Sequence, residues 1–318
     1  MKLYSTFLFL LFSFCTLAQS MQEVKAVTDT YSGLLTAEKL ANRINTDFKT
    51  NDAKIKAVYC WITKNIRYDL EEFFNPTRKE FRFSYQTEEE KNQKLLAIKN
   101  NTVKKTLQSR KGVCEGYAQT FSKICDLLSI ENEVVAGYVK PTYAYLGKPL
   151  AQANHAWNAV KLNDEWIFID TTWGAGFEVN GKWKRQFNQY YFNIPKNKLL
   201  KTHLAEKSIW NLQAGSITKE LFFNQPIYKT PFLQSDVVLV KPNTGKLQKN
   251  NNGLVTILVN KLPPASDVRV GFLGNPYAQK VSVINKQNQQ IITVKPPADA
   301  QYLFLIIDNE VVLTFLID

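Results

Sequence analysis

Three residues whose types could perform thiol chemistry lie between Arg110 and Gly176, namely Cys114, His155 and Asp170. A thiol attacks a carbonyl carbon only as the thiolate, so it needs a base or a lowered pKa. An imidazole can act as that base and later return the proton to a leaving amine. A carboxylate on the far ring nitrogen would hold the imidazole in the required tautomer. The three residues therefore form a candidate set of nucleophile, base and orienting group.

The residues after Cys114 indicate that it lies at the start of a helix. A glycine precedes it by two positions, and apolar residues then recur at spacings of three and four, at Tyr117, Phe121, Ile124 and Leu128. That spacing is typical of one face of a helix. At a helix N-terminus the macrodipole and the free N–H groups favour a thiolate and can also face an oxyanion.

His155 begins a stretch in which alternate residues face opposite sides, which predicts a strand over residues 155–162. Asn163-Asp164 is a turn signal, and Trp166 to Thr171 is then predicted to be the partner strand of a hairpin. His155 and Asp170 fall near the open ends of the two strands, within diagonal reach of each other.

The order of Cys at a helix start, then His and Asp on adjacent strands, resembles the transglutaminase-like superfamily. The segments that carry the resemblance are GVCEGYAQTFSKICDLLSI, NHAWNAVKLNDEWIFIDTTWG and YYF. They are most similar to its bacterial and kyphoscoliosis-peptidase-like branch, over roughly residues 50–235. The resemblance implies a papain-like α+β core, in which a helix carrying Cys packs on an antiparallel sheet carrying His and Asp. It also implies acyl transfer through a thioester, with Cys114 as nucleophile, His155 as base and Asp170 as the orienting carboxylate.

Several residues near these motifs are predicted to contact a substrate. They are Glu115, Gly116, Tyr117, Asn154, Trp157, Trp173 and Trp61. The aromatic members are at least as well explained by packing in the core, and a loop over residues 141–153 is also placed to line a cleft. His203 lies in the part of the chain that resembles the tail of the family, and is predicted to be structural rather than a second base.

The cysteine count leaves the redox state open. Cys60, Cys114 and Cys125 would be either three free thiols, or one pair of Cys60 and Cys125 with Cys114 free. Cys114 and Cys125 are too far apart for a disulfide within one straight helix. No Cys or His spacing suggests a metal site, and no cofactor is predicted.

The first residues predict a secretory signal peptide over residues 1–18, with an apolar run from Leu3 to Leu17 and cleavage after Ala18. A lipoprotein anchored at Cys15 is the alternative. The chain is expected to be periplasmic or extracellular, with no stable membrane span. Its formal charge is +12, but the basic residues are scattered and accompany no nucleic-acid-binding motif. The simplest interpretation of these residues is a solvated surface, and a weaker one is attraction to anionic substrates.

Seven short β-rich runs after Ser235 predict a second domain. The predicted division is a catalytic domain over residues 19–235, with its core at about 50–180 and the family tail at 187–235, followed by an immunoglobulin-like β-sandwich over 236–318. The expected function is an exported peptidase or amidase, with a peptide, protein or cell-wall amide as substrate. The alternatives are a protein-crosslinking transglutaminase and a non-catalytic peptide-binding envelope adaptor. The β-sandwich is the predicted contact for an envelope partner.

Overall fold

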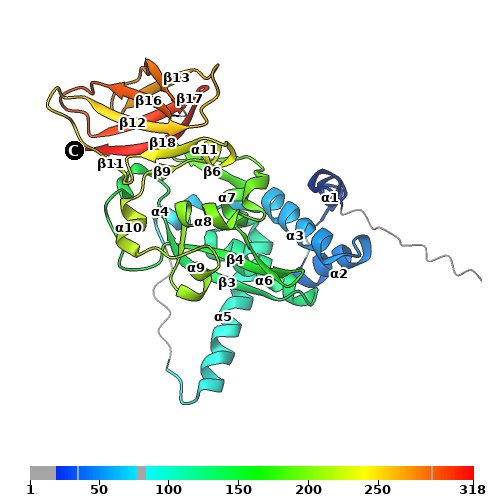
Figure 1. Cartoon of the computed structure of the whole chain (residues 1–318). Helices are drawn as coiled ribbons and strands as arrows, with labels where there is room; N and C mark the ends of the chain where they lie inside the picture. The colour runs from blue at the N-terminus through cyan, green and yellow to red at the C-terminus, as the bar shows by residue number, and fades with distance from the viewer. Residues whose placement is uncertain (1–18, 34–35, 77–83, 288) are drawn as a thin grey trace, which may run out of the picture.

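The computed structural model describes residues 19–33, 36–76, 84–287 and 289–318 (Figure 1). The predicted signal peptide at residues 1–18, including Cys15, lies outside the described residues. Two main hydrophobic cores are present, one within the N-terminal helices and the sheet they cover, and one within the C-terminal strands. Their contents match the predicted fold class, an α+β core followed by an all-β region, and confirm it.

Among the described residues, six helices precede the central sheet. They are α1 (Met21–Thr28), α2 (Ala37–Asp47), α3 (Asn51–Asn65), α4 (Leu70–Phe74), α5 (Glu88–Ser109) and α6 (Cys114–Leu127). All of them except α4 contribute buried residues to the first core. Thr50 caps α3 by accepting a hydrogen bond from the Ala53 N–H, as short hydroxyl side chains at helix starts do. The middle of α3 is buried on all sides, since α1, α2, α6 and the short helix α7 (Thr171–Ala175) all pack against it.

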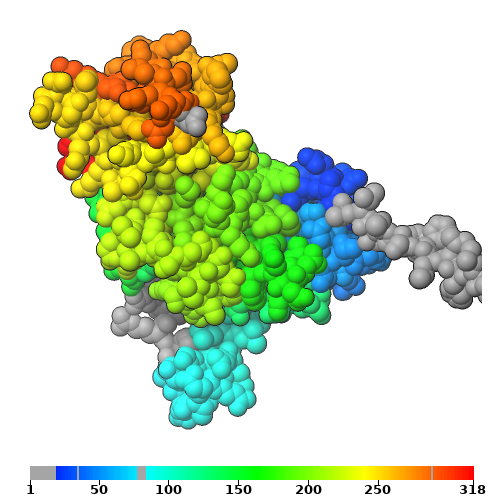
Figure 2. Space-filling model, in the orientation of Figure 1, coloured from blue at the N-terminus to red at the C-terminus, as the bar shows by residue number. Residues whose placement is uncertain are grey.

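The segment at residues 71–101, expected to be an exposed and partly helical insertion, contains α4 and most of α5. The first turns of α5 project away from the body at the end opposite the C-terminal strands (Figures 1 and 2). Leu95 and Leu96 are exposed there. The last turns of α5 return to the core and pack on α6 through Thr106 and Leu107. This long helix therefore leads the chain back to the segment before Cys114.

The central sheet has four antiparallel strands in the order β5-β4-β3-β8. Their bounds are β3 (Asn132–Val139), β4 (His155–Leu162), β5 (Glu165–Ile169) and β8 (His203–Ala205). β4 is buried along most of its length because α6 covers it and β3 and β5 flank it. The predicted hairpin is confirmed, with Leu162 opposite Glu165 across the turn.

Short elements lie between the strands of the central sheet and between that sheet and the C-terminal strands. They are η1 (Tyr143–Tyr145), α7 (Thr171–Ala175), β6 (Gly176–Val179), β7 (Lys182–Arg185), η2 (Gln189–Tyr191), α8 (Lys196–Thr202), α9 (Ser208–Leu212), α10 (Lys219–Asn224), β9 (Ile227–Tyr228) and α11 (Thr230–Gln234). Two further strands, β1 (Arg67–Tyr68) and β2 (Lys111–Gly112), pair in parallel just before Cys114.

The seven β-rich runs predicted after Ser235 are all strands. Their bounds are β10 (Val238–Lys241), β12 (Val255–Asn260), β13 (Val268–Phe272), β15 (Val283–Lys286), β16 (Gln289–Val294), β17 (Tyr302–Ile307) and β18 (Glu310–Ile317), with short β11 (Lys246–Leu247) and β14 (Gln279–Lys280) between them. They form one sheet in the order β10-β12-β16-β15 and another in the order β11-β18-β17-β13-β14. Alternate side chains from both sheets form the second core, as expected for a sandwich.

The junction between the two cores is closely packed. β9 pairs with β18, and Phe232 of α11 belongs to the C-terminal core. The Tyr143 ring of η1 lies 4.7 Å from the Tyr302 ring of β17. The loop over residues 141–153 thus contacts the C-terminal sheet through Tyr143, and residues 227–234 join the second core ahead of the predicted boundary at 235/236.

Lys140 anchors the same region. Its side chain is buried, and its ammonium group donates to the backbone carbonyls of Phe222, Gln225 and Pro226. Burial lowers the pKa of Lys140 to about 7. The three carbonyls at the end of α10 oppose that shift, because they stabilise the charged form. The contact ties the end of β3 to the segment that enters the C-terminal sheets.

Candidate active site

Cys114 is the first residue of α6, as predicted. The β1–β2 pairing brings Arg67 opposite Lys111 and Tyr68 opposite Gly112, and so fixes the chain immediately before the helix. Val113 occupies the N-cap position and offers no side-chain hydrogen bond to the helix. The first N–H groups of α6 are therefore not capped by a side chain of that residue, which is the arrangement that suits an anion at a helix start.

His155 and Asp170 meet at the open end of the β4–β5 hairpin. His155 Nε2 lies 2.8 Å from Asp170 Oδ2, and both side chains are buried. Since an ionised carboxylate only accepts hydrogen bonds, the Nε2–H of His155 donates to it. The diagonal contact predicted from the two strand patterns is present.

Asp170 is held by the start of the next helix. It is the N-cap of α7, and its Oδ1 accepts hydrogen bonds from the Thr172 N–H at 2.8 Å and the Trp173 N–H at 3.0 Å. Burial alone would raise the pKa of Asp170, but the charge and hydrogen bond of His155, together with His203, lower it well below its ordinary value. Asp170 is therefore a carboxylate at neutral pH, despite its complete burial.

A close turn follows Asp170 and depends on Gly174. A Cβ atom added at Gly174 would lie 2.0 Å from Tyr59 Oη, which in turn donates to the Asn188 carbonyl at 2.5 Å. No side chain fits that space without moving the buried Tyr59 of α3. The glycine thus allows α7, and with it Asp170, to pack against α3.

The environment of His155 links it to Cys114. Burial tends to lower the pKa of His155, but the Asp170 charge and hydrogen bonding with Asp170 and Cys114 outweigh it and raise the pKa to about 10. Because Nε2 donates to Asp170, Nδ1 is the ring nitrogen left for the sulfur. The structure therefore places Cys114 next to His155, whose other ring nitrogen contacts Asp170.

Tyr68 also lies close to Cys114. Burial raises the pKa of Tyr68, as do the charges of Cys114 and Asp170, whereas hydrogen bonding from the Cys114 backbone lowers it. The Tyr68 ring stacks on Trp183 with centroids 5.6 Å apart. A phenol is thus positioned at the first backbone N–H of α6.

A second histidine, His203, belongs to the same buried group, whereas the sequence predicts only a structural role for it. His203 Nε2 lies 3.1 Å from Asp170 Oδ2, and its Nδ1 lies 2.8 Å from Thr202 Oγ1. Burial lowers the pKa of His203, so the ring is neutral at pH 7. Its Nε2–H then donates to Asp170, and its Nδ1 accepts from the Thr202 hydroxyl. Asp170 Oδ2 therefore accepts from two imidazoles.

His155, Asp170 and His203 also have the chemistry of a cation site, because two imidazoles and a carboxylate are common zinc ligands. Their ligand atoms all lie within 4.8 Å of one another. Both imidazole nitrogens, however, lie at hydrogen-bond distance from the same carboxylate oxygen. Hydrogen bonding thus accounts for the arrangement without an ion.

The residues predicted to contact a substrate separate into two groups. Trp61, Tyr117 and Trp157 are almost completely buried, and the Tyr117 hydroxyl donates to the Ile66 carbonyl. These three residues therefore pack in the core and do not line a cleft. The prediction failed for them because sequence spacing places a residue on one face of a helix or strand but does not show whether that face is covered.

The other four predicted contacts are partly exposed or occupied. Asn154 exchanges two hydrogen bonds with the backbone of Val139, and Glu115 accepts from the Gln119 side chain. Gly116 packs against α5. Trp173 is half-buried, and its ring centroid lies 5.7 Å from that of His155 and 4.9 Å from that of His203. Among the predicted aromatic contacts, Trp173 is the one beside the candidate triad that retains exposed surface.

All three cysteines of the described residues are free, and Cys60 and Cys125 are not joined. Burial raises the pKa of Cys60 to about 12 and that of Cys125 well above its ordinary value. Cys114 is more exposed than either. Of the two alternatives left open by the sequence, the structure has the three free thiols and not the Cys60–Cys125 pair, and of these thiols Cys114 has access to both solvent and a base.

The raised pKa of His155 predicts a pH-dependent stability. The folded protein binds the His155 proton up to about pH 10, whereas the ordinary value is 6.5. The unfolded chain therefore holds fewer protons in that window, and this contribution to stability is complete below 6.5 and lost as the pH rises to about 10. Lys140 acts in the opposite direction. We expect the difference in melting temperature between the wild type and His155→Gln to shrink over this window, and an unchanged difference would contradict the assignment.

Comparisons with known proteins agree with the motifs. Residues 38–171, which include Cys114, His155 and Asp170, match the family described as the transglutaminase-like superfamily. The human kyphoscoliosis peptidase is 25% identical over 276 residues, covering 85% of this chain and 38% of that protein. The mouse kyphoscoliosis peptidase is 26% identical over 247 residues, covering 77% of this chain and 34% of that protein.

A crystal structure of a TGase overlaps 57% of this chain and 40% of its own, with 18% identity and a TM-score of 0.31. The chain spans little more than a third of the length of the two kyphoscoliosis peptidases. The family match over residues 38–171 confirms the resemblance inferred from the sequence motifs at the level of the superfamily.

Proposed function

We propose that this chain, a member of the transglutaminase-like superfamily through residues 38–171, is a cysteine-dependent acyl-transfer enzyme that acts on peptide or protein amide bonds. The observation that carries the proposal is the buried contact of 2.8 Å between His155 and Asp170, beside a free cysteine at the start of α6. In this arrangement the proposed nucleophile Cys114 lies next to the base His155, and the base contacts the orienting carboxylate of Asp170.

Because His155 holds its second proton up to about pH 10, the proposed cycle begins with an imidazolium at His155 beside a Cys114 thiolate. The thiolate attacks the amide carbonyl, and the carbonyl oxygen becomes an oxyanion that the N–H groups at the start of α6 stabilise. His155 gives its proton to the leaving amine as the C–N bond breaks, which leaves a thioester on Cys114. An incoming water loses a proton to His155 and attacks the thioester, the C–S bond breaks, and the thiolate of Cys114 and the imidazolium of His155 are restored. Asp170 stabilises the imidazolium throughout.

Hydrolysis is the first choice of outcome. Water is the default acceptor, and both compared relatives are named peptidases. An amine could replace water in the last step, and the product would then be a crosslink. The signal peptide predicted at residues 1–18 makes export a further part of the proposal. No helix among the described residues is both long and apolar enough to span a membrane.

A test with p-nitrophenyl acetate separates these outcomes. The ester should acetylate Cys114, and intact-protein mass spectrometry would detect the thioester. Addition of cadaverine then reveals the acceptor, because acetate is the product of hydrolysis and acetyl-cadaverine is the product of amine transfer. If folded protein remains unmodified, while an unfolded control reacts at its thiols, the enzyme proposal fails and the peptide-binding adaptor becomes the better account.

His203 is proposed to position Asp170 and to tune His155. Its Nε2–H shares Asp170 Oδ2 with His155, so it competes for the charge that stabilises the imidazolium. A hydrogen bond to a charged group contributes about 1.5–3 kcal/mol. We expect His203→Leu to reduce acetylation roughly tenfold or more and to move the alkaline limb of its pH profile upward.

The matched control is His203→Gln, whose amide N–H can still donate to Asp170. We expect this variant to restore most of the rate and the original pH profile. A merely structural role would predict equal losses in both variants and no movement of the alkaline limb.

A further inference from the structure

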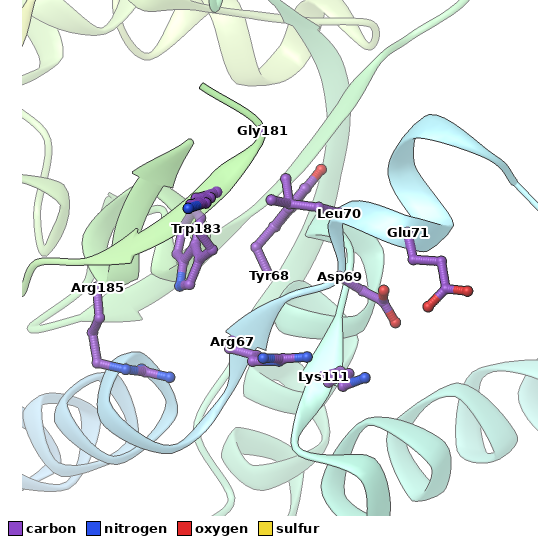
Figure 3. A pocket seen from close by; sticks show the side chains of 10 residues that line it. Arg67, Tyr68, Asp69, Leu70, Glu71, Lys111, Gly181, Trp183 and Arg185 are labelled. Atoms are coloured by element: carbon purple, nitrogen blue, oxygen red, sulfur yellow. The ribbon is translucent and has the colours of Figure 1, made fainter. Parts of the chain in front are cut away.

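A pocket of about 480 Å³ lies beside the nucleophile helix (Figure 3). β1, β2 and β7 contribute to its walls, together with the start of α4. We propose that this pocket is a subsite for a carboxylate group of the substrate, close to the amide bond that is attacked. The inference rests on the proposed acyl-transfer function and adds to it a preference for acidic substrates.

The pocket is connected to Cys114 through two residues. Lys111 lines it and precedes Cys114 by three positions. Tyr68 also lines it, stacks on Trp183 within it, and has its hydroxyl beside the Cys114 backbone. A substrate whose carbonyl carbon reaches the Cys114 sulfur would therefore have its neighbouring groups near the pocket.

Positive charge predominates in the pocket. Arg67, Lys111, Lys182 and Arg185 line it, against Asp69 and Glu71. The side chains of Arg67, Lys111 and Lys182 make no hydrogen bond or ion pair with any described residue, whereas Arg185 donates to the carbonyls of Thr63 and Ile66. Three of the four cations are thus available to a ligand.

The two acids do not neutralise these cations. Asp69 accepts a hydrogen bond from the Glu72 N–H as the N-cap of α4, and Glu71 lies on the same helix. Figure 3 shows both acids on one side of the pocket and Arg185 and Trp183 on the other, with Arg67 and Lys111 below Tyr68. Within the described residues, neither acid forms an ion pair with a cation of the pocket. The four cations and two acids leave a net charge of +2 in the pocket, which favours an anionic group such as a carboxylate.

The carboxylate could be a side chain or the C-terminus of a peptide, since both present the same group. Three thiol-reactive probes distinguish these sources. They are iodoacetyl-Gly-Gln-amide, iodoacetyl-Gly-Glu-amide and iodoacetyl-Gly-Gln with a free C-terminus. The measurement is the rate at which each probe alkylates Cys114, read by peptide mass spectrometry on the folded chain.

We expect one or both acidic probes to react about fivefold faster than the neutral probe, which is the upper effect of one partly exposed charge pair. The double variant Arg67→Gln/Lys182→Gln should bring the ratio close to one. Its matched control is Lys249→Gln/Lys280→Gln, which removes the same charge from exposed positions of the C-terminal region, one in the loop after β11 and one in β14, and should leave the ratio unchanged. The faster acidic probe identifies the source of the carboxylate.

Different results would contradict the carboxylate subsite and the acyl-transfer function. Equal rates for all three probes in the wild type would remove the subsite and leave the thiol chemistry intact. If both double variants lost the preference for acidic probes equally, the preference would come from the net charge of the protein. The pocket would then not be the carboxylate subsite. Failure of the neutral probe to react with Cys114 would instead remove the proposed function, and the subsite with it.

Discussion

Asp170→Asn should abolish most of the acetylation of Cys114 while leaving much of the fold in place. The asparagine Oδ1 can still accept from the Thr172 and Trp173 N–H groups. Its amide, however, would present N–H donors to His155 and His203, which themselves donate at that point. His155 would then have to change tautomer, and such a change lowers turnover by about 10⁴-fold in a comparable triad.

The same substitution should also reduce stability, because it removes one partner of a buried ion pair. Such losses are typically about 3–5 kcal/mol. Asp52→Asn is a suitable control, since Asp52 pairs with Lys56 at the surface of α3 with its side chain 26% exposed, and we expect it to lose less than about 1 kcal/mol. Retention of full acetylation in Asp170→Asn would show that Asp170 does not orient His155. Denaturant unfolding and p-nitrophenyl acetate labelling together measure both effects.

Cys114→Ala should remove covalent acyl transfer altogether. No other thiol among the described residues can replace it, because Cys60 and Cys125 are buried and burial raises the pKa of each. We expect a loss of about 10⁴-fold or more in ester turnover, as for other nucleophiles.

Cys60→Ala and Cys125→Ala are the matched controls for Cys114→Ala. Each removes a buried sulfur from the core, so each should lower the melting temperature while the acetylation of folded protein persists. An acetyl group found on another residue in Cys114→Ala, at the wild-type rate, would show that the nucleophile has been misassigned.

The sequence predicted the candidate triad because its members lie on elements with clear periodicity. Cys114 precedes a helical pattern, and His155 and Asp170 lie at the ends of a hairpin whose turn, Asn163-Asp164, is marked by residue type. Local patterns of this kind need no knowledge of distant contacts. The positions of these three residues therefore followed from the sequence.

The contact of His203 with Asp170 could not be predicted from local patterns. His203 lies on a strand of only three residues, and reaches Asp170 from 33 positions away through the pairing of β8 with β3. No periodic signal marks so short a strand. The one available clue was that the chain contains just two histidines, which made each a candidate for the site.

The β-rich runs after Ser235 were also predictable, but their arrangement was not. Which strands share a sheet depends on pairings between distant segments, such as β11 with β18. The pairing of β9 with β18 likewise joins residues before the predicted boundary to the C-terminal sheet. Buried aromatic residues such as Trp61 could not be separated from cleft residues, because burial is set by what covers them.

The most direct test of the central claim is iodoacetamide labelling of the three cysteines at mildly acidic pH, read by peptide mass spectrometry. If Cys114 and His155 share a proton, Cys114 should be labelled rapidly in folded protein, because a neighbouring imidazolium stabilises the thiolate. Cys60 and Cys125 should remain unlabelled, and His155→Ala should suppress the reaction of Cys114. Labelling of Cys114 that is slow, or that is equally fast in His155→Ala, would contradict the proposed pair of Cys114 and His155.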